Sequence, residues 1–549
     1  MARNGTDWRA GARGIAWRTA MVVALVCLLV APASATQPMA ALDRGTDTTP
    51  YALPPEALEK IDPTLLQELV SREGMEPLPS PAARAADDPV TYLVHLGEAT
   101  LPTALSLPTD RLARRHAVVA WLQERARRSQ RDAVDLLRQH VASGRIAGFR
   151  SYWIANVLVV EGGLETAVAL TLLPTVAAIV PNRAIPLALP EGPELSQEPP
   201  NIAWGVDRID ADRVWAECGI TGRGIVVANV DSGVDWTHPD LQRKYRGYNA
   251  ADPAASDHNY HWFDFTGTYP RAPGPRDTTG NYVAKVHGTH VMGTIVGSSP
   301  DGTTITGVAP EAQWIAVKVF DDNGQPATEE AFLASFQWLL APTDLQGAHP
   351  DPAKAPDVVC NSWGDSEDGA STVFRQSIEA LRAAGILTVF AAGNTGPGTG
   401  TIDVPASYTN TLAIGATNPT DLVAEFSSRG PSPGGQLKPD LMAPGVSIVS
   451  TAPGGGYATL SGTSMATPHA AGTLALMLEA DCSALGVPTV PITTIEGILR
   501  DTALELGDPG PDNTYGYGRI DAHAAVGVVQ GMHRLVLPLL IRRAPALRP

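Results

Sequence analysis

The sequence predicts an α/β protein with a largely parallel sheet, preceded by a smaller α+β unit. Three observations lead to this prediction. From about residue 200 onward, short apolar runs typical of buried strands alternate with helical segments, as in a parallel sheet covered by helices on both faces. Between residues 88 and 188 the order is strand, helix, strand, helix, strand. The 549 residues suffice for two or three compact units and a large buried core.

In the smaller unit, the first strand is expected at residues 90–96, a run rich in β-branched and aromatic residues. A long helical stretch follows at 109–142, where apolar residues recur at helical spacing. Two further strands are expected at 154–160 and 176–180, on either side of a short helix at 164–172.

In the larger region, strands and helices are expected to alternate along the chain. This alternation predicts that consecutive strands lie parallel, with the helices as crossovers. The expected strands are 225–230, 314–320, 358–360, 387–391, 412–416 and 446–450, and the expected helices are 287–296, 329–340, 372–384 and 464–478.

The first 35 residues have the features of a secretion signal. Arginines precede an apolar run that ends near Ala31, and Ala33-Ser34-Ala35 fits a cleavage site. A membrane anchor is the alternative, but the apolar run of about 12 residues is shorter than the roughly 20 that a spanning helix needs. We therefore expect a secreted, extracellular protein with no transmembrane segment.

The remaining chain divides at changes of composition. A loose, Pro-rich leader with one short helix at 63–71 precedes the α+β unit, and a polar, Pro-rich linker that would hold a processing site follows it. The last residues are apolar with basic flanks and predict either a packed final strand or a surface-attachment tail. The expected segments are 1–35 (signal peptide), 36–87 (leader), 88–188 (α+β unit), 189–200 (linker), 201–528 (α/β domain) and 529–549 (tail).

Charge and cysteine content narrow the functional classes. The formal net charge is −17, which disfavours nucleic acid as a partner. Ten arginines lie between residues 111 and 150, and they would either complement the acidic second half or form a solvated helix face. Cys218, Cys360 and Cys482 remain after signal cleavage; this odd, sparse set argues against a disulfide framework and favours free thiols, with one bridge left open.

The first candidate catalytic residue is Asp231, the last residue of an apolar run that begins at Val226. It would stand at the carboxyl end of a buried strand, where the catalytic groups of open parallel sheets gather. A carboxylate there needs partners, because an unpaired buried charge is costly. The alternative is a turn or capping aspartate, since Asp-Ser-Gly is a common turn sequence.

Two histidines, His287 and His290, stand one turn apart at the start of an expected helix. Histidines at this spacing can bind zinc, but the zinc-protease pattern H-E-x-x-H is absent. A helix N-terminus disfavours a protonated imidazole, which suits a neutral general base. We therefore expect His287 to act as a base and His290 to be structural.

Ser464 and Asn394 complete the set of candidates. Ser464 is expected where a turn meets a helix N-terminus, so that backbone N–H groups and the helix dipole would favour negative charge on a substrate oxygen. Asn394 ends a strand and a small-residue turn, and its amide can donate to an oxyanion. The alternatives are an ordinary helix cap for the serine and a left-handed turn for the asparagine.

Together these segments resemble the subtilisin, or subtilase, family of serine proteases. The motifs Asp-Ser-Gly, His-Gly-Thr-His, Ala-Gly-Asn and Gly-Thr-Ser-Met-Ala occur in the family's order, aspartate first, then histidine, then serine. Segments that begin at Tyr248, Ala312, Pro356 and Asn513 are similar to the bacillopeptidase F group. The resemblance covers about residues 200–525 and, more weakly, 88–188. It implies a subtilisin-like three-layer fold with a largely parallel central sheet, preceded by a small α+β propeptide domain.

The resemblance implies a catalytic triad of Asp231, His287 and Ser464. Ser464 would attack the scissile carbonyl, His287 would transfer the proton, and Asp231 would orient the imidazole. The side chain of Asn394 and the backbone N–H of Ser464 would hold the oxyanion. The expected function is therefore a secreted serine endopeptidase that acts through an acyl-enzyme and needs no cofactor for its chemistry.

The resemblance also implies how a protein or peptide substrate would bind, as a strand added to the enzyme. An aspartate near the floor of the primary pocket, Asp403, would favour Lys or Arg in the substrate, although a solvated loop aspartate is the alternative. Trp363 stands where the family usually has a smaller aliphatic residue, so the shape of the pocket stays open. The residues expected to line this pocket are Ser362, Trp363, Gly364, Ala392 and Gly393.

Calcium is the metal that the resemblance suggests, in a structural role. Asp240 matches a calcium-binding position of the family, whereas the sequence Ser-Ser-Pro-Asp-Gly at 298–302 replaces the usual Asn-rich turn. Hard oxygen ligands of this kind would stabilise loops. No complete calcium site is assigned.

The α+β unit is expected to act as an intramolecular chaperone and inhibitor. Its last strand runs into a segment that would lie in the active-site cleft, with self-cleavage between Ile185 and Pro200. The mature protein is expected to be a monomer.

Two other classes of protein remain as alternatives. An α/β-hydrolase esterase would carry its triad in the order Ser, Asp, His, with a G-x-S-x-G elbow, whereas the elbow here ends in Ala466. A catalytically silent binding protein on the same fold would have lost a triad or oxyanion residue, and all four candidates are present.

Overall fold

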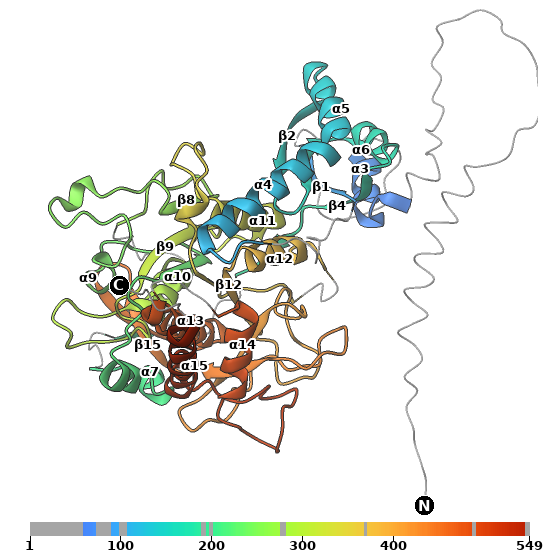
Figure 1. The fold of residues 1–549 in the computed structure, drawn as a ribbon. Coiled ribbons are helices and arrows are strands. Elements are labelled where there is room, and N and C mark those ends of the chain that lie inside the picture. Colours follow the sequence, from blue (N-terminus) through green and yellow to red (C-terminus); the bar gives the residue numbers. More distant parts are fainter. Residues whose placement is uncertain are drawn as a thin grey trace, which may run out of the picture.

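The structure is a computed structural model that describes residues 59–72, 89–97, 107–187, 194–196, 201–274, 282–366, 371–485 and 490–543. The expected signal peptide and most of the expected leader lie outside the described residues. We call the described residues from 59 to 187 the small unit and those from 201 to 543 the large unit (Figure 1).

A seven-stranded sheet forms the centre of the large unit, in the order β14-β13-β12-β11-β7-β9-β8. Every pair of neighbours in this sheet is parallel, which confirms the predicted architecture. Strands β8 and β14 were not expected. The strands are β7 (Val226–Asp231), β8 (Trp262–Asp264), β9 (Gln313–Lys318), β11 (Val358–Asn361), β12 (Leu387–Ala391), β13 (Leu412–Thr417) and β14 (Leu441–Pro444).

Helices cover both faces of this sheet, and this explains why its strands are continuous apolar runs. In β11, Val358 and Cys360 face one core and Val359 faces the other. The first core packs under α10 (Tyr282–Val296) and α13 (Thr463–Leu485). The second packs under α11 and α12. Helices α11 and α12 span Glu329–Leu340 and Arg375–Ala383. The other described helices of the large unit are α7 (Trp204–Arg208), α8 (Ala211–Arg213), α9 (Pro239–Gln242), α14 (Ile492–Asp501) and α15 (Ala522–Arg543).

Two expectations for the large unit were wrong. The strand expected at 446–450 is β15 (Ile448–Ala452), which pairs antiparallel with β16 (Gly456–Leu460) outside the parallel sheet. The apolar end of the chain is not a final strand, because α15 continues to Arg543. Ala525, Val526 and Val529, in the first part of α15, bury their side chains in the first core.

The small unit is a four-stranded antiparallel sheet with helices, as predicted in outline. Its strands lie in the order β2-β3-β1-β4. The strand expected at 154–160 begins later, and β2 was not expected. The elements are α3 (Pro63–Arg72), β1 (Val90–Leu96), α4 (Arg111–Ser129), α5 (Arg131–Ala142), β2 (Ile146–Tyr152), β3 (Val157–Gly162), α6 (Leu164–Thr171), β4 (Val176–Pro181) and β5 (Ala184–Ile185).

The helix expected at 109–142 is divided into α4 and α5 at Gln130. Val118 and Leu122 of α4 belong to the core that the small unit shares with the large unit, whereas Ala133 and Leu137 of α5 belong to the small unit's own core. One straight helix does not serve two cores on opposite faces of a sheet, so the division follows from packing.

The sheet of the small unit is buried on both faces. Val94 and Leu158 face its own core, and Leu93 and Val157 face the core that continues under α11 and α12 of the large unit. Figure 1 shows α4 lying beside α11 and α12. The two units therefore share one apolar core.

Charged contacts reinforce this junction. Arg115 of α4 is buried and donates to the carbonyl oxygens of Ala355 and Pro356, at 2.9 and 2.6 Å, and to Asp357 Oδ1 at 2.8 Å. Arg150 forms an ion pair with Glu330. Part of the basic segment thus complements acidic groups of the large unit. Arg127, Arg128, Arg131 and Arg138 are instead largely exposed.

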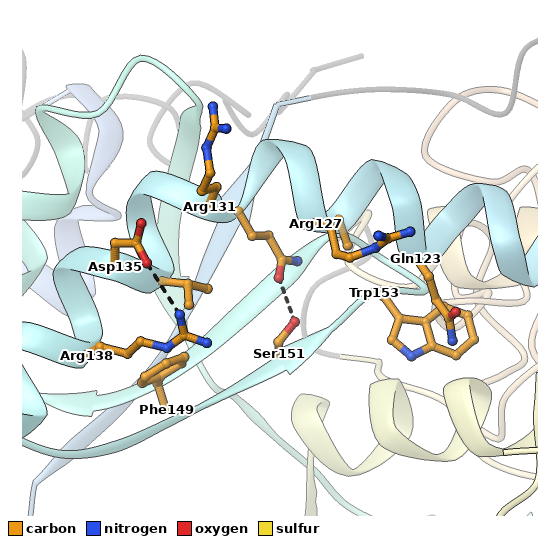
Figure 2. A pocket seen from close by; sticks show the side chains of 11 residues that line it. Gln123, Arg127, Arg131, Asp135, Arg138, Phe149, Ser151 and Trp153 are labelled. Atoms are coloured by element: carbon orange, nitrogen blue, oxygen red, sulfur yellow. Dashed lines mark hydrogen bonds and ion pairs between the residues drawn. The ribbon is translucent and has the colours of Figure 1, made fainter. Parts of the chain in front are cut away.

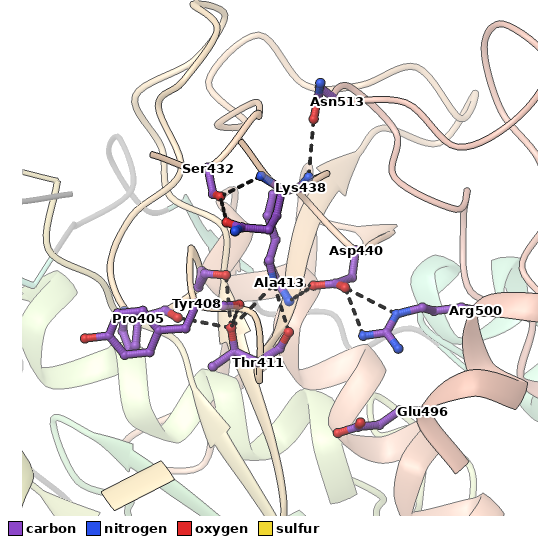
Figure 3. A network of polar contacts seen from close by, with 12 residues as sticks. Pro405, Tyr408, Thr411, Ala413, Ser432, Lys438, Asp440, Glu496, Arg500 and Asn513 are labelled. Carbon is purple, nitrogen blue, oxygen red and sulfur yellow. Dashed lines mark hydrogen bonds and ion pairs between the residues drawn. The ribbon is translucent and has the colours of Figure 1, made fainter. Parts of the chain in front are cut away.

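A buried polar network fixes the loop that follows Asp403 (Figure 3). Asp440 Oδ2 accepts from Lys438 Nζ at 2.7 Å and from the N–H of Ala413 at 2.8 Å, and its Oδ1 accepts from Arg500 at 2.9 Å. Lys438 also donates to the carbonyl oxygen of Thr411 at 2.8 Å. Asp440 therefore ties β13, α14 and the 405–411 loop together.

We expect Asp440→Asn to lower the free energy of unfolding by about 3–5 kcal/mol, because the buried Lys438 ammonium loses its counter-charge. The measurement is urea denaturation of the full chain followed by circular dichroism. Asp501→Asn, at an exposed position beside Arg500, is the matched control and should shift stability by no more than about 0.5 kcal/mol. Equal effects of the two substitutions would contradict the assigned role.

Candidate active site

The candidate catalytic residues gather at the carboxyl ends of three neighbouring strands. Asp231 is the last residue of β7, Ser362 follows β11, and Asn394 follows β12 shortly after its last residue. Because β7, β11 and β12 are adjacent and parallel, these three positions lie at the same edge of the sheet.

Asp231 and His287 form a buried pair. The two carboxylate oxygens lie 2.8 and 3.1 Å from His287 Nδ1, and Asp231 Oδ1 also accepts from the N–H of Ser232 at 2.6 Å. An ionised carboxylate only accepts, so Nδ1 carries the proton and Nε2 is left as an acceptor. A Cβ at Gly288 would lie 2.4 Å from the carbonyl oxygen of Gly233, so only glycine permits this close approach of helix and strand.

Ser464 lies in the first turn of α13 and is linked to the strand edge through Ser362. Its Oγ donates to the carbonyl oxygen of Ser362 at 3.1 Å, and Ser362 Oγ donates to the carbonyl oxygen of Ser464 at 2.9 Å. His287 Nε2 is buried and has no hydrogen-bond partner among the described residues. In this structure the hydroxyl therefore bonds to Ser362 rather than to the imidazole.

Asn394 is oriented by the residue before the serine. Its Oδ1 accepts from both the N–H and the hydroxyl of Thr463, each at 2.9 Å. Because an N–H donor requires the carbonyl oxygen, the Nδ2 of Asn394 is the group left to donate. A Cβ at Gly462 would lie 3.6 Å from the Ser464 N and 3.7 Å from Asn394 Nδ2. Two N–H donors thus border one small space that no side chain fills.

His290 is a structural residue, as predicted. Its Nε2 lies 3.0 and 3.1 Å from the carbonyl oxygens of Ile448 and Ala458, and it joins α10 to β15 and β16. Burial lowers the pKa of His290 to about 3, so the ring is neutral. The part of the chain that the structure describes contains no cluster of three or more His, Cys, Asp or Glu suited to a metal ion.

Of the residues expected to line the primary pocket, some lie together around Asp403 and one has its side chain elsewhere. Gly364, Ala392 and Gly393 lie around Asp403, whose N–H donates to the carbonyl oxygen of Ala392 at 3.0 Å. The side chain of Trp363 instead lies in the apolar core, with its ring centroid 3.9 Å from that of Phe332. The side chain of Trp363, which was expected among the residues that line the pocket, is therefore packed in the core instead.

Asp403 is not the solvated loop aspartate that was the alternative. It is 3% exposed, and a Cβ at Gly364 or Gly393 would meet it at 2.6 or 2.5 Å. Burial, together with the charge of Asp365, raises the pKa of Asp403 to about 7. Asp403 Oδ1 has no hydrogen-bond partner among the described residues, so a buried carboxyl oxygen lies unpaired between the two glycines.

Asp240, the position at which the resemblance suggests calcium, makes contacts within the protein. Asp240 Oδ2 accepts from the hydroxyl of Tyr457 at 2.6 Å, and its carbonyl oxygen accepts from Lys244 Nζ at 2.7 Å. Calcium needs six to eight oxygen ligands, whereas the oxygens of Asp240 named here accept from a tyrosine hydroxyl and from an ammonium group.

A pocket of about 510 Å³ lies away from these residues, on the small unit (Figure 2). It is formed by residues of α4, α5 and β2, together with Gln130 and Trp153 next to these elements. Ser151 donates to Gln130 Oε1 at 2.6 Å inside it. Its lining combines arginines with aromatic rings: Gln123, Ala126, Arg127, Gln130, Arg131, Val134, Asp135, Arg138, Phe149, Ser151 and Trp153.

One contributor to the site was missed by sequence reasoning: Thr463 orients Asn394. Its position directly before Ser464 was the only feature of the sequence that could have indicated a role for Thr463 in the site. Ser362 was expected to line the pocket, and in the structure its carbonyl oxygen also holds the Ser464 hydroxyl. Cys360 and Cys482 are free in the structure, and Cys360 is fully buried whereas Cys482 is partly exposed.

A parallel α/β sheet that brings an Asp–His pair, a serine at a helix N-terminus and two oriented N–H donors to one edge has the architecture of a serine hydrolase. A sequence model of the subtilase family matches residues 222–518. The chain therefore belongs to the subtilase family and is a subtilisin-like serine protease by descent.

Individual relatives agree with this assignment. The chain is 38% identical to bacillopeptidase F of Bacillus subtilis over 441 residues, which are 77% of this chain and 29% of that protein. It is 33% identical to M-protease of Shouchella clausii over 67% of this chain and 79% of that protein. Subtilisin E of Bacillus subtilis is 34% identical over 59% of this chain and 71% of that protein. The chain thus spans less than a third of the length of bacillopeptidase F.

None of the helices that the structure describes is both long enough and apolar enough to cross a bilayer.

Proposed function

We propose that this chain is a serine endopeptidase that hydrolyses peptide bonds in proteins through an acyl-enzyme intermediate. Two observations at this edge of the sheet carry the proposal. His287 Nε2 has no hydrogen-bond partner among the described residues, so it can accept a proton, and the Ser464 N–H and Asn394 Nδ2 lie beside Gly462 as donors for an oxyanion. Family membership supports the same reading.

The proposed chemistry uses the groups as the structure orients them. The Ser464 hydroxyl turns from the Ser362 carbonyl to His287 Nε2, gives up its proton and attacks the substrate carbonyl carbon. Catalytic hydrogen bonds of this kind often form only when substrate is bound. The oxyanion is held by Asn394 Nδ2 and the Ser464 N–H, and protonated His287 then donates to the leaving amine.

We further propose that the protein is made as a secreted, self-processing precursor, with the small unit as its intramolecular inhibitor. β5 adds to β10 (Ala327–Thr328) of the large unit as an antiparallel strand, in the manner of a bound peptide. Arg183, just before β5, forms an ion pair with Glu329 at 2.9 Å. Residues 194–196 then pair with β16. Cleavage between Ile185 and Pro200 would separate the two units.

A catalytically silent binding protein is the second candidate, favoured only by the hydroxyl of Ser464 being bonded to Ser362. A fluorophosphonate probe separates the two candidates, because it labels an activated serine and not an ordinary hydroxyl. We expect labelling at Ser464 together with cleavage of an unfolded protein substrate. Absence of both, in chain freed of the small unit, would favour the binding protein.

We propose Asp403 as the group that recognises Lys or Arg in the substrate. Because its pKa is raised to about 7, ionisation and hence preference for a basic side chain should increase as the pH rises through 7. The expected preference, as a ratio of kcat/KM for basic over neutral substrates, is roughly 10–100-fold at alkaline pH. Peptide-library profiling at pH values on either side of 7 measures it.

Two variants make this specificity test decisive. Asp403→Asn should abolish both the preference and its pH dependence, while the exposed Asp508→Asn should leave them unchanged. A basic preference that survives in Asp403→Asn would remove Asp403 from the pocket.

A further inference from the structure

The loop at residues 298–305 is joined to the short helix α9 by the ammonium group of Lys244 and by a hydrogen bond from the Ser298 N–H to the carbonyl oxygen of Asp240 at 3.3 Å. Lys244 Nζ donates to the carbonyl oxygen of Asp240 at 2.7 Å, to the carbonyl oxygen of Ser298 at 2.9 Å and to Ser298 Oγ at 2.6 Å. An ammonium has three N–H donors and no acceptor, so three oxygens satisfy it completely.

The acidic groups around this loop are engaged within the protein. Asp240 Oδ2 accepts from Tyr457. Asp301 closes its own turn, with Oδ1 accepting from Ser299 Oγ at 2.6 Å and from the N–H and hydroxyl of Thr303 at 3.1 and 2.8 Å. One carboxylate oxygen of Asp240 and one of Asp301 are therefore engaged with internal donors. A divalent ion placed beside Ser298 would be repelled by the Lys244 ammonium.

The same loop carries the first residues of the large unit. Ile305 donates through its N–H to the carbonyl oxygen of Asn201, and Ala203 donates to the carbonyl oxygen of Ile305, both at 2.9 Å. Ser298 and Ile305 are themselves bridged across the loop. Whatever holds Ser298 against α9 therefore also supports the docking of residues 201–203.

We propose that the Lys244 ammonium is a built-in cation that takes the place at this loop where the family resemblance suggests calcium. The loop and the segment docked on it are then stable without a metal ion. Burial disfavours the charged ammonium and lowers the pKa of Lys244 to about 7, whereas the charge of the nearby Asp240 acts to raise this pKa.

The first test measures thermal unfolding of the full chain in millimolar calcium and in EDTA, with Ser464→Ala as background so that the chain stays intact. We expect any calcium effect on Tm to be unchanged by Asp240→Asn, because no calcium binds there. A calcium-dependent rise in Tm that disappears in Asp240→Asn would overturn the proposal.

The second test replaces the cation. Lys244→Met should lower Tm by about 5 °C, in calcium and EDTA alike, and speed amide hydrogen exchange at Ala203 and Ile305. Arg243→Met is the matched control, since Arg243 is the exposed neighbouring residue. Should Lys244→Met not fold, Ser298→Ala removes one of the three acceptors and is expected to give a smaller change in the same direction. Exchange at Ala203 and Ile305 equal to that of the control variant would refute the role of Lys244.

Discussion

Ser464→Ala is expected to lower kcat by about a million-fold, the size of loss found when the nucleophile of subtilisin is removed. The alanine keeps the fold of α13 but removes the oxygen that would attack the substrate. The chain should also remain uncleaved between the small and large units, because self-processing needs the same oxygen. Peptide hydrolysis and the mass of the purified chain measure the two effects.

Two variants sharpen this prediction. The double variant Ser464→Ala, His287→Ala should be no slower than either single variant, since the two residues act as one unit. Ser461→Ala is the matched control, because its Oγ accepts only a loop contact from the N–H of Ser447 at 2.8 Å. A Ser464→Ala chain that still matures when pure would show that another agent cuts the linker.

Asp231→Asn should lower kcat by roughly 10⁴-fold while leaving the fold intact. The asparagine amide would present an N–H to His287 Nδ1, which now has to accept. The ring would then carry its proton on Nε2, the atom that must take the proton from Ser464. The Asn carbonyl oxygen can still accept from Ser232, so Tm should change little.

The measurement is steady-state peptide hydrolysis together with thermal unfolding. Asp252→Asn, at an exposed position that caps only the local turn at Ala254, should retain full activity. Normal turnover by Asp231→Asn would mean that this carboxylate does not set the imidazole tautomer.

The sequence predicted the parallel sheet and the four main candidates because these depend on local patterns. Buried parallel strands are continuous apolar runs, and Asp231, His287, Asn394 and Ser464 stand in compact motifs. It did not predict the break at Gln130, which arises because two helices serve cores on opposite faces of one sheet.

The directions in which individual side chains point could not be predicted from the sequence either. Trp363 adjoins Ser362 and Gly364 in sequence, yet its ring lies among phenylalanines in the core. Asp403 could be exposed or buried until its two glycine neighbours were placed on either side of it. Lys244 showed no pattern at all, because its three acceptors come from residues four positions before it and 54 after it.

Because the two units share one apolar core, the small unit depends on the large unit for part of its stability. Leu93 and Val157 of the small unit are covered by α4 and, in large part, by residues of the large unit. If the connecting chain were cut and the units parted, that face of the small sheet would meet water, and the fragment would lose the stabilisation that burial of this face provides. If the chain matures as proposed, the released small unit is therefore expected to unfold more readily than it does in the full chain and to be open to proteolysis.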